Sequence, residues 1–256
     1  MLVVDAVSKR FGGLLAVADA SLTVPRGSIT GLIGPNGAGK TTLFTVIAGF
    51  TAPSTGRVLF DDVDVTHEPA HRRARRGIVR TFQIVQPFAG LSVRENIAVG
   101  THLRHAGRAA ALERASAVGT CVGLGAELDK SAASLTIAGR KRLELARALA
   151  TEPLLLLLDE VLAGLNPTEI EAMLPILRDI CASGVTILMI EHVMQAVMQL
   201  CSQVHVLAQG RMIATGPPRE VCADPAVIEA YLGAGAAARM VAHAPVAVHA
   251  PGVPHE

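Results

Sequence analysis

A glycine-rich run near residue 34 constrains the fold of this chain more than any other feature. The run reads GPNGAGKT from Gly34 to Thr41. An apolar segment, SITGLIG, enters it, and a helical pattern that starts at Gly39 and runs through KTTLFTVIAGF leaves it. In this order a buried strand is followed by a glycine turn and then by the amino end of a helix, whose free N–H groups attract anions. We therefore expect a strand–loop–helix cradle for phosphate.

Each residue type in this run has a part in binding a nucleotide. Glycines let the backbone turn successive N–H groups toward phosphate oxygens. Lys40 offers a cation to the β- and γ-phosphates, and Thr41 offers a hydroxyl to Mg²⁺. A glycine turn with an incidental lysine is the alternative, and the flanking strand and helix disfavour it. The predicted nucleotide-binding residues are Gly34, Pro35, Asn36, Gly37, Ala38, Gly39, Lys40, Thr41 and Thr42.

A second candidate element follows five consecutive leucines, Leu154–Leu158. This length suits a buried strand and is too short to cross a bilayer. Asp159 and Glu160 come directly after it. Asp159 is placed to hold Mg²⁺, directly or through water, and Glu160 to orient a water for attack on the γ-phosphate. The pair indicates hydrolysis by water more than transfer to a bound acceptor.

Strands and helices alternate along much of the chain, which is typical of parallel α/β architecture. The first sixty residues read as strands with turns, residues 66–76 as a basic helix and residues 78–82 as a strand. Residues from about 84 to 134 are Ala-rich and mostly helical in pattern. After them we expect a strand at LLLLL, a helix at Pro167–Ala182, a strand at GVTILMI, a helix at EHVMQAVMQLC, and strands at VHVLA and RMIATG.

Composition limits the remaining possibilities. Half of the residues are hydrophobic and the mean hydropathy is +0.43, yet no window holds the ~18 consecutive apolar residues of a membrane span. The four cysteines are scattered, which is typical of reduced thiols. The net charge of +1 does not favour a nucleic-acid partner. We expect Arg72, Arg73, Arg75 and Arg76 to form a solvated helix face. We expect a single domain at residues 1–232, followed by a disordered tail at residues 233–256, which are rich in Ala, Pro and His.

Four further landmarks stand in a fixed order around the glycine-rich run, and together they resemble the ATP-binding subunit of ABC transporters. Gln83 in RTFQ resembles that family's glutamine, which touches Mg²⁺ and the attacking water. His192 in IEH resembles its switch histidine, which contacts the γ-phosphate. Phe11 stands where the family stacks an aromatic ring on adenine, and Ala163, Gly164, Leu165 and Asn166 match its D-loop. Taken singly, Gln83 also reads as a strand-end polar residue, His192 as a neighbour of a helix start and Phe11 as core.

The resemblance covers residues 1 to about 232 and implies the fold and the partners. It implies an α/β protein with a P-loop NTPase (RecA-like) parallel-sheet core, an N-terminal antiparallel β subdomain and an α-helical subdomain inserted at about 84–150. RTFQ, AGLNP, IEH and the ending AYLG resemble the larger of two ATPase subunits of branched-chain amino acid importers. Implied partners are two transmembrane permeases, a second cassette (or a second copy of this chain) and, indirectly, an extracytoplasmic solute-binding protein. The resemblance places this chain itself at the cytoplasmic face of the membrane. Ile84, Val85, Phe88 and Leu91 offer either a groove for the permease or subdomain core.

The stretch LTIAG departs from the family pattern. In the family the signature Leu-Ser-Gly-Gly-Gln binds the nucleotide held by the partner subunit, and the residues in those positions here are Leu135, Thr136, Ile137, Ala138 and Gly139. Ile137 resists positive φ, and the Cβ of Ala138 crowds an approaching phosphate. A one-residue shift that gives Gly139 the role of a lost glycine is an alternative. We expect the composite site built on this signature to hydrolyse ATP more slowly than the site on this chain's own cradle. Val161 and Asn166 replace the family's usual Pro and Asp, and neither change removes a ligand.

Two other functions compete with the transporter reading. A soluble ABC-type ATPase of repair or translation usually carries long coiled coils or two cassettes, and neither pattern occurs in this sequence. A GTPase is disfavoured because the chain has no Asn-Lys-x-Asp guanine-reading motif. The cargo does not touch this subunit, so urea or another small amide stays an alternative to branched-chain amino acids.

Overall fold

The computed structural model describes residues 1–81 and 86–232. The strands are β1 (Leu2–Phe11), β2 (Leu14–Val24), β3 (Ile29–Ile33), β4 (Thr55–Phe60), β5 (Val63–Asp64), β6 (Ile78–Arg80), β7 (Leu155–Asp159), β8 (Thr186–Ile190), β9 (Gln203–Ala208) and β10 (Arg211–Gly216). The helices are α1 (Lys40–Ile47), α2 (Ala70–Arg76), α3 (Val93–Thr101), α4 (Arg108–Cys121), α5 (Ile137–Leu149), α6 (Pro167–Ala182), α7 (Met194–Leu200), α8 (Pro218–Ala223) and α9 (Pro225–Leu232). Short 3₁₀ turns occur at Gly125–Glu127 and Ala132–Ser134.

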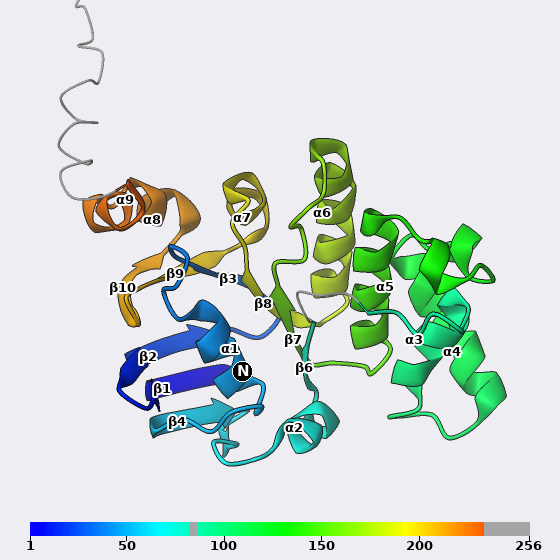
Figure 1. The fold of residues 1–256 in the computed structure, drawn as a ribbon, viewed down its shortest axis with the longest axis horizontal. Coiled ribbons are helices and arrows are strands. Elements are labelled where there is room, and N and C mark those ends of the chain that lie inside the picture. Colours follow the sequence, from blue (N-terminus) through cyan, green and yellow to red (C-terminus); the bar gives the residue numbers. More distant parts are fainter. Residues whose placement is uncertain (82–85, 233–256) are drawn as a thin grey trace, which may run out of the picture.

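Two sheets organise these elements (Figure 1). An antiparallel sheet has the order β2-β1-β4-β5, and a second sheet has the order β10-β9-β3-β8-β7-β6. In the second sheet β9, β3, β8, β7 and β6 run parallel, and only β10 pairs antiparallel. The parallel core is the one that the alternation of strands and helices predicts.

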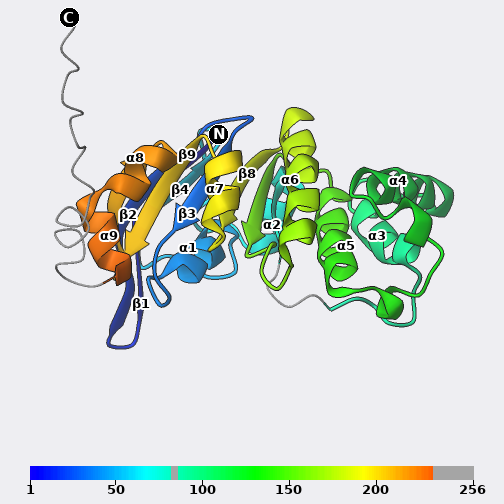
Figure 2. The same ribbon diagram turned by 90° about the horizontal axis from the view of Figure 1, so that it is seen from above.

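The leucine run shows why the parallel sheet is buried on both faces. All five residues of β7 are buried. Side chains of a strand alternate between faces, so Leu155 and Leu157 pack with α1 and the antiparallel sheet, whereas Leu156 and Leu158 pack with α6 and α7. Figures 1 and 2 show α1 between the two sheets and α6 and α7 across the other face. A strand covered on both faces needs a continuous apolar run.

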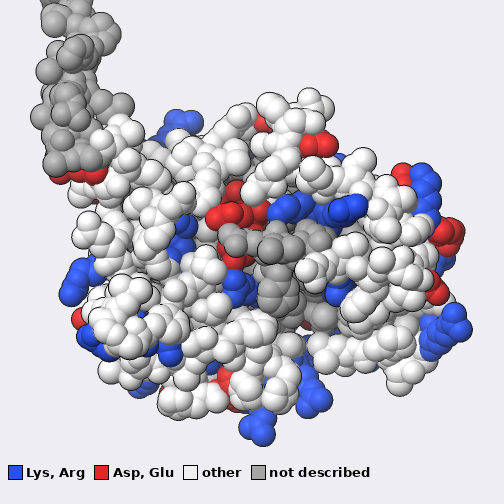
Figure 3. Space-filling model, viewed as in Figure 1, with Lys and Arg blue, Asp and Glu red and all other residues white. Residues whose placement is uncertain are grey.

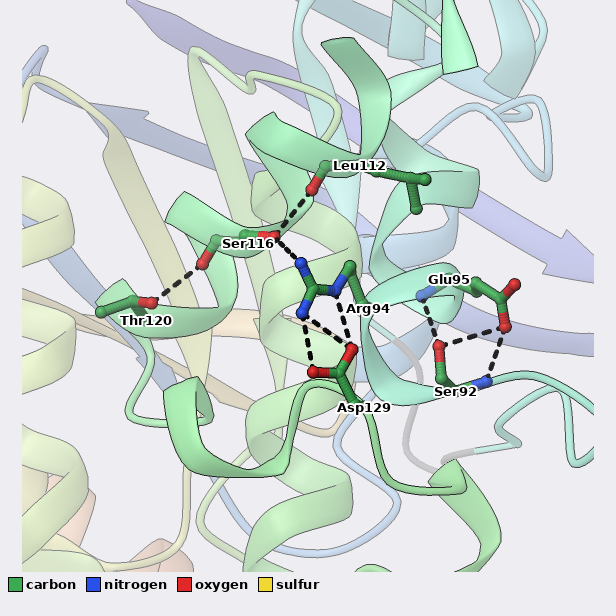
Figure 4. A network of polar contacts seen from close by, with 7 residues as sticks. All are labelled: Ser92, Arg94, Glu95, Leu112, Ser116, Thr120 and Asp129. Atoms are coloured by element: carbon green, nitrogen blue, oxygen red, sulfur yellow. Dashed lines mark hydrogen bonds and ion pairs between the residues drawn. The ribbon is translucent and has the colours of Figure 1, made fainter. Parts of the chain in front are cut away.

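Helices α3, α4 and α5 lie together beyond the β6 edge of the sheet, in both views (Figures 1 and 2). A polar network joins α3 to α4 and to Asp129, which precedes α5 in the chain (Figure 4). Arg94 donates through Nη2 to both carboxylate oxygens of Asp129, at 2.7 and 2.9 Å, and through Nη1 to the Ser116 hydroxyl on α4. Ser92 and Glu95 form a reciprocal capping box at the start of α3. The network holds the first turn of α3 against α4 and the segment that leads to α5.

Several boundaries differ from the sequence prediction. The helix expected at 66–76 begins only at Ala70, because the Thr66 hydroxyl instead accepts a bond from the Val58 N–H in a strand connection and Pro69 precedes the first turn. The strand expected at 78–82 ends at Arg80, and Phe82 lies outside the described residues. The helix expected from residue 191 begins at Met194, which leaves residues 191–193 as a loop. Helices α8 and α9 follow β10 and were not predicted.

The prediction of a solvated arginine face is wrong for Arg73. This side chain is fully buried, and its guanidinium donates to the carbonyls of Val46 and Ile47 at 2.7 and 2.6 Å and to those of Thr66 and Glu68. It therefore caps carbonyls in the last turn of α1. Burial lowers the pKa of Arg73 to about 10. Its helix neighbours Arg72, Arg75 and Arg76 are exposed, as predicted.

The surface carries charges of both signs. On the face shown in Figure 3, Lys and Arg side chains are interspersed with Asp and Glu. Within residues 1–81 and 86–232, no helix combines the length and the apolar character that crossing a membrane requires. The tail predicted at 233–256 lies outside the described residues.

Candidate nucleotide-binding site

Three strands of the parallel sheet end at one edge and carry the predicted site residues there. β3 leads into Gly34, β7 ends at Asp159, and β8 leads into Glu191 and His192. Asp159 is paired in register with Ile190, so the ends of β7 and β8 are level. In open parallel sheets ligands bind outside the carboxyl ends of the strands. The predicted residues from three distant stretches of sequence are thus neighbours.

The glycine-rich loop is packed so closely that two of its glycines cannot be replaced. Gly34 has φ 147° and Gly39 has φ 102°. A Cβ at Gly34 would overlap the Leu207 carbonyl, and a Cβ at Gly39 would overlap the Ala16 carbonyl. Gly39 directly precedes Lys40, where α1 begins, one residue later than predicted. The loop is therefore a fixed backbone cradle at a helix N-terminus.

Lys40 occupies the interior of this loop. The side chain is buried, and its ammonium donates to the Gly34 carbonyl at 2.7 Å and the Pro35 carbonyl at 3.0 Å. Burial lowers its pKa, and the nearby Glu160 and Asp159 oppose that shift. The cation therefore stands between the loop and the two carboxylates, where β- and γ-phosphates would bring the compensating charge.

A cavity of about 520 Å³ opens at the cradle, a volume suited to a small-molecule ligand. It is lined by Asn36–Thr42, Glu160 and five residues that the sequence reasoning missed: Leu14, Leu15, Ala16, Gln209 and Gly210. Leu14 is 67% exposed although it is apolar. The pair of leucines after Gly12-Gly13 is the sequence feature that could have indicated this part of the cavity wall. Phe11 lies on the same hairpin but does not line this cavity; its ring is half exposed, with the Lys9 ammonium 5.0 Å from its centroid.

Asp159 has one carboxylate oxygen occupied and one open. Oδ2 accepts from Arg80 of β6 at 2.7 Å, in a pair that is almost fully buried. Oδ1 is buried and has no hydrogen-bond partner among the described residues. A buried carboxylate oxygen without a partner fits a metal ion or its water, and Thr41 lines the cradle cavity together with Glu160, the residue that follows Asp159. The chain thus offers oxygen ligands where Mg²⁺ was predicted; the third predicted ligand, Gln83, lies outside the described residues.

Glu160 and His192 meet at this edge. His192 Nε2 lies 3.1 Å from Glu160 Oε1. The Glu160 backbone has φ 53°, and its N–H donates to the Ile190 carbonyl at 3.0 Å. A left-handed conformation is uncommon for a residue with a Cβ and persists only where the surroundings impose it, often at functional sites. The side chains predicted to act on the attacking water and on the γ-phosphate are thus in contact.

The predicted signature forms the start of α5. Leu135 is buried, and Thr136 is the N-cap, whose hydroxyl accepts from the Gly139 N–H at 3.1 Å. Ile137 and Ala138 are the first two helical residues and have negative φ, so the expected conflict between Ile137 and a positive φ does not arise. Gly139 is helical as well, so it does not take over a left-handed glycine position. Ile137 is 62% exposed.

The predicted D-loop connects Glu160 to α6. Ala163 and Gly164 are exposed, and Leu165 packs against the core. Asn166 is the N-cap of α6 and forms a capping box with Glu169, each side chain accepting from the other's N–H. Since Asn caps as well as Asp, the departure at Asn166 leaves the helix start intact.

The family is shown by direct comparison. A family model described as "ABC transporter" matches residues 17–163, and one described as "Branched-chain amino acid ATP-binding cassette transporter" matches residues 211–237. The chain belongs to the ABC transporter family of ATP-binding cassettes. It is accordingly an ATP-binding and ATP-hydrolysing subunit with the P-loop NTPase fold of those cassettes, as the sequence predicted.

Relatives of this cassette match it over nearly their whole length. The chain is 38% identical over 250 residues to the high-affinity branched-chain amino acid transport ATP-binding protein BraF of Pseudomonas aeruginosa, covering 91% of this chain and 98% of BraF. It is 37% identical over 249 residues to LivG of Escherichia coli, a protein of the same description, with the same coverage. The ADP conformation of MJ1267, an ATP-binding cassette of an ABC transporter, matches it with a TM-score of 0.83 and 32% identity, over 91% of this chain and 98% of that one.

Proposed function

We propose that this cassette energises an importer of branched-chain or other hydrophobic amino acids, as the larger of two ATPase subunits. The observation that carries the catalytic part is the Glu160–His192 contact beside the Lys40 cradle. The match of residues 211–237 to the branched-chain description and the similarity to BraF and LivG support the choice of cargo. We also take residues 1–232 as one cassette, with the helices of 84–150 as its helical subdomain.

The cradle would hold the triphosphate. Backbone N–H groups of the glycine-rich loop and the N-terminus of α1 favour phosphate oxygens, and Lys40 exchanges its loop carbonyls for the β- and γ-phosphates. Thr41 and the open oxygen of Asp159 would hold Mg²⁺, which supplies charge neutralisation on the phosphates when bound. Arg80 fixes the other oxygen of Asp159, so the carboxylate keeps one orientation.

Glu160 would direct the attacking water. Its carboxylate lines the cavity and is held by the imidazole of His192 at 3.1 Å. From this position Glu160 accepts a hydrogen bond from the water and orients its lone pair toward the γ-phosphorus. His192, in contact with Glu160, would bind the γ-phosphate once the nucleotide is present. Most of the rate enhancement comes from positioning and charge, as in other phosphoryl transfers.

The partners follow from the same family. Two cassettes would pair so that the first turn of α5 meets the partner's nucleotide. A permease would dock beside Phe88, whose ring is 46% exposed and is covered on one side by Arg147, 4.7 Å from the ring centroid. Buried Asn96 holds this loop by bonding the N–H and carbonyl of Phe88. Ile84 and Val85, predicted with Phe88, lie outside the described residues, and Leu91 is half-buried. The cassette would thus sit at the cytoplasmic face of the membrane.

The test is affinity purification of tagged Glu160→Gln from native membranes with ATP, with the wild type as the matched control. Loss of the base should trap the closed ATP-bound assembly, so the variant should retain two polytopic permeases and a second cassette better than the wild type does. A solute-binding protein encoded with those permeases then supplies the cargo assay. It should bind leucine, isoleucine or valine and not urea.

Two outcomes would count against this proposal. Recovery of Glu160→Gln from the soluble fraction with ribosomal or repair proteins, and without a permease, would overturn the transport role while leaving the ATPase in place. Binding of urea in preference to branched-chain amino acids by the solute-binding protein would replace the cargo.

A further inference from the structure

A buried lysine links α5 to the end of β7. Lys141 lies in the second turn of α5 and is 7% exposed. Its ammonium donates to the main-chain carbonyl of Glu160 at 3.1 Å. Lysine is almost never fully buried without a partner, because its charge loses hydration. Here a lysine of the helical region reaches the backbone of the residue that directs water, 19 positions further along the chain.

The backbone that Lys141 contacts is held at several points. The Glu160 carbonyl also accepts from the Ala163 N–H at 3.1 Å, and the Glu160 N–H donates to the Ile190 carbonyl. The Leu162 N–H donates to the buried Glu191 carboxylate at 2.9 Å. The loop of residues 160–163 is thus fixed from β8 on one side and from α5 on the other. This fixation maintains the left-handed φ of 53° at Glu160.

The charge of Lys141 also suits this place. Burial raises the pKa of Glu191 to about 7, the charge of Glu160 adds to that rise, and Lys141 opposes it. Lys141 is therefore near the Glu191 carboxyl group as well as the carbonyl that it bonds. An apolar side chain of similar length would fill the space but supply neither the donor nor the cation.

We propose that Lys141 is a positioning residue for ATP hydrolysis, holding the Glu160 backbone from α5 so that the carboxylate faces the γ-phosphate. The inference rests on the proposed role of Glu160. In this proposal α5 both approaches the partner's nucleotide and holds the Glu160 backbone. Ile137 lies one turn before Lys141 on the same helix face, at the start of α5 where the partner's nucleotide would bind. Displacement of α5 by that contact would shift the Glu160 carbonyl of the same chain, which couples the two sites.

The experiment compares Lys141→Met, Lys141→Arg and wild type in the full-length chain with the subunits that copurify with it. Steady-state ATPase activity gives kcat and KM, and fluorescent ATP binding gives Kd. Met keeps the length and removes the donor, whereas Arg keeps a donor and the charge. We expect Lys141→Met to lower kcat about 10- to 100-fold, the loss typical of a small displacement of a reacting group. KM and Kd should stay within about twofold, because among the described residues the Lys141 ammonium bonds the Glu160 carbonyl and not the glycine-rich loop, and Arg should restore most of kcat.

A structural readout separates positioning from general damage. Amide hydrogen exchange in the peptide that contains residues 160–163 should quicken in Lys141→Met and not in Lys130→Met, which removes an exposed lysine paired only to Glu127. If Lys141→Met does not fold, Lys141→Gln, whose shorter amide falls short of the carbonyl, is measured by the same criteria.

Three results would overturn the inference. One is a kcat for the Met or Gln variant within twofold of Lys130→Met, and another is an equal loss of kcat in Lys141→Arg. The third is unchanged exchange at 160–163. Glu160→Gln is measured in parallel; if it keeps full turnover, the proposed role of Glu160 fails, independently of the result at Lys141.

Discussion

The glycine-rich cradle and the signature turn both begin a helix, yet they tolerate substitution very differently. At the cradle, Gly34 and Gly39 have left-handed φ values, and backbone carbonyls occupy the space that a Cβ would need. At the signature, Ile137 and Ala138 are ordinary first-turn residues behind the Thr136 cap. The first helix start depends on its glycines for its shape, and the second depends only on a cap.

The difference shows which of these residues the backbone conformation requires and which matter mainly for contact with a ligand. A change at Gly34 would alter the backbone, so the intact cradle pattern is required for the fold as well as for phosphate. Loss of both signature glycines leaves α5 in place, so in the proposed pair only the contact with the partner's nucleotide would change. In the proposed pair, the exposed Ile137 side chain would stand where a glycine would leave the backbone N–H open to that nucleotide.

The sharpest test of this comparison is the separate removal of each water-directing glutamate in the assembled pair. Glu160→Gln disables the site built on this chain's cradle, and we expect total turnover to fall by about 10²-fold or more. The equivalent change in the partner disables the site that uses the altered signature and should lower turnover less than about twofold. Steady-state ATPase measurements decide the matter. The reverse pattern would show that the altered signature does not slow its site.

Glycine-to-alanine changes at the two helix starts compare their stability directly. Gly34→Ala should destabilise the fold by about 3 kcal/mol or more, because the Cβ overlaps the Leu207 carbonyl and φ is unfavourable. Gly139→Ala should change the free energy of unfolding by less than about 1 kcal/mol. Its Cβ would lie 3.2–3.4 Å from Leu135 and Thr136, and the gain in helix propensity offsets this crowding. Urea unfolding measures both, and similar losses would contradict the comparison.

The loop that follows β8, between the cradle and the signature helix, carries an electrostatic cost at the buried Glu191. Burial raises the pKa of Glu191 to about 7. The folded state then binds a proton more readily than the unfolded state, so this group's contribution to stability falls as pH rises from about 4.5 to about 7. Glu191→Gln keeps an acceptor for the Leu162 N–H and removes the charge. We expect equal stability at pH 4.5 and a gain of up to roughly 3 kcal/mol at pH 8.

Chemical unfolding of the wild type and Glu191→Gln across this pH range gives the difference curve. Glu169→Gln serves as the control for an acid that only caps a helix. A constant difference between wild type and Glu191→Gln from pH 4.5 to 8 would mean that Glu191 does not titrate in this window.

The smallest expected effect tests the cap of the signature helix. Thr136→Ala removes the acceptor for the Gly139 N–H and should destabilise the protein by about 1 kcal/mol. Thr136→Ser keeps the hydroxyl and should retain most of the stability. Thermal unfolding of the three proteins measures the difference. An unchanged midpoint in Thr136→Ala would mean that packing of Leu135 and Leu143 alone fixes the start of α5.

The sequence predicted the parts of the fold that depend on local pattern. The leucine run and the alternation of strands and helices indicated a parallel sheet, and the structure has one. Boundaries were less well predicted. The helix at 70–76 begins later than expected because the Thr66 hydroxyl bonds the Val58 N–H across a strand connection, a contact that helix periodicity does not report.

Arg73 and Lys141 illustrate what residue type alone does not reveal. Arg73 was predicted to lie on a solvated face, and Lys141 stands in a similar basic helical stretch, but each is buried and donates to main-chain carbonyls outside its own helix. Whether a long cationic side chain turns outward or reaches such a carbonyl depends on which helix end or strand end packs against it. Only the assembled fold provides that neighbour.

By itself, the sequence determined the cradle and the order of the chemical groups around it. Phosphate binding has local requirements, which can be recognised from the sequence alone. They are the glycine spacing, a lysine and a hydroxyl at the start of a helix, and a carboxylate pair after an apolar strand. The tertiary structure decided which groups meet: Glu160 with His192, Asp159 with Arg80, and Lys141 with the Glu160 backbone. The reason is that parallel strands from distant segments end at one edge, and their register and the helices packed beside them set every distance across the site.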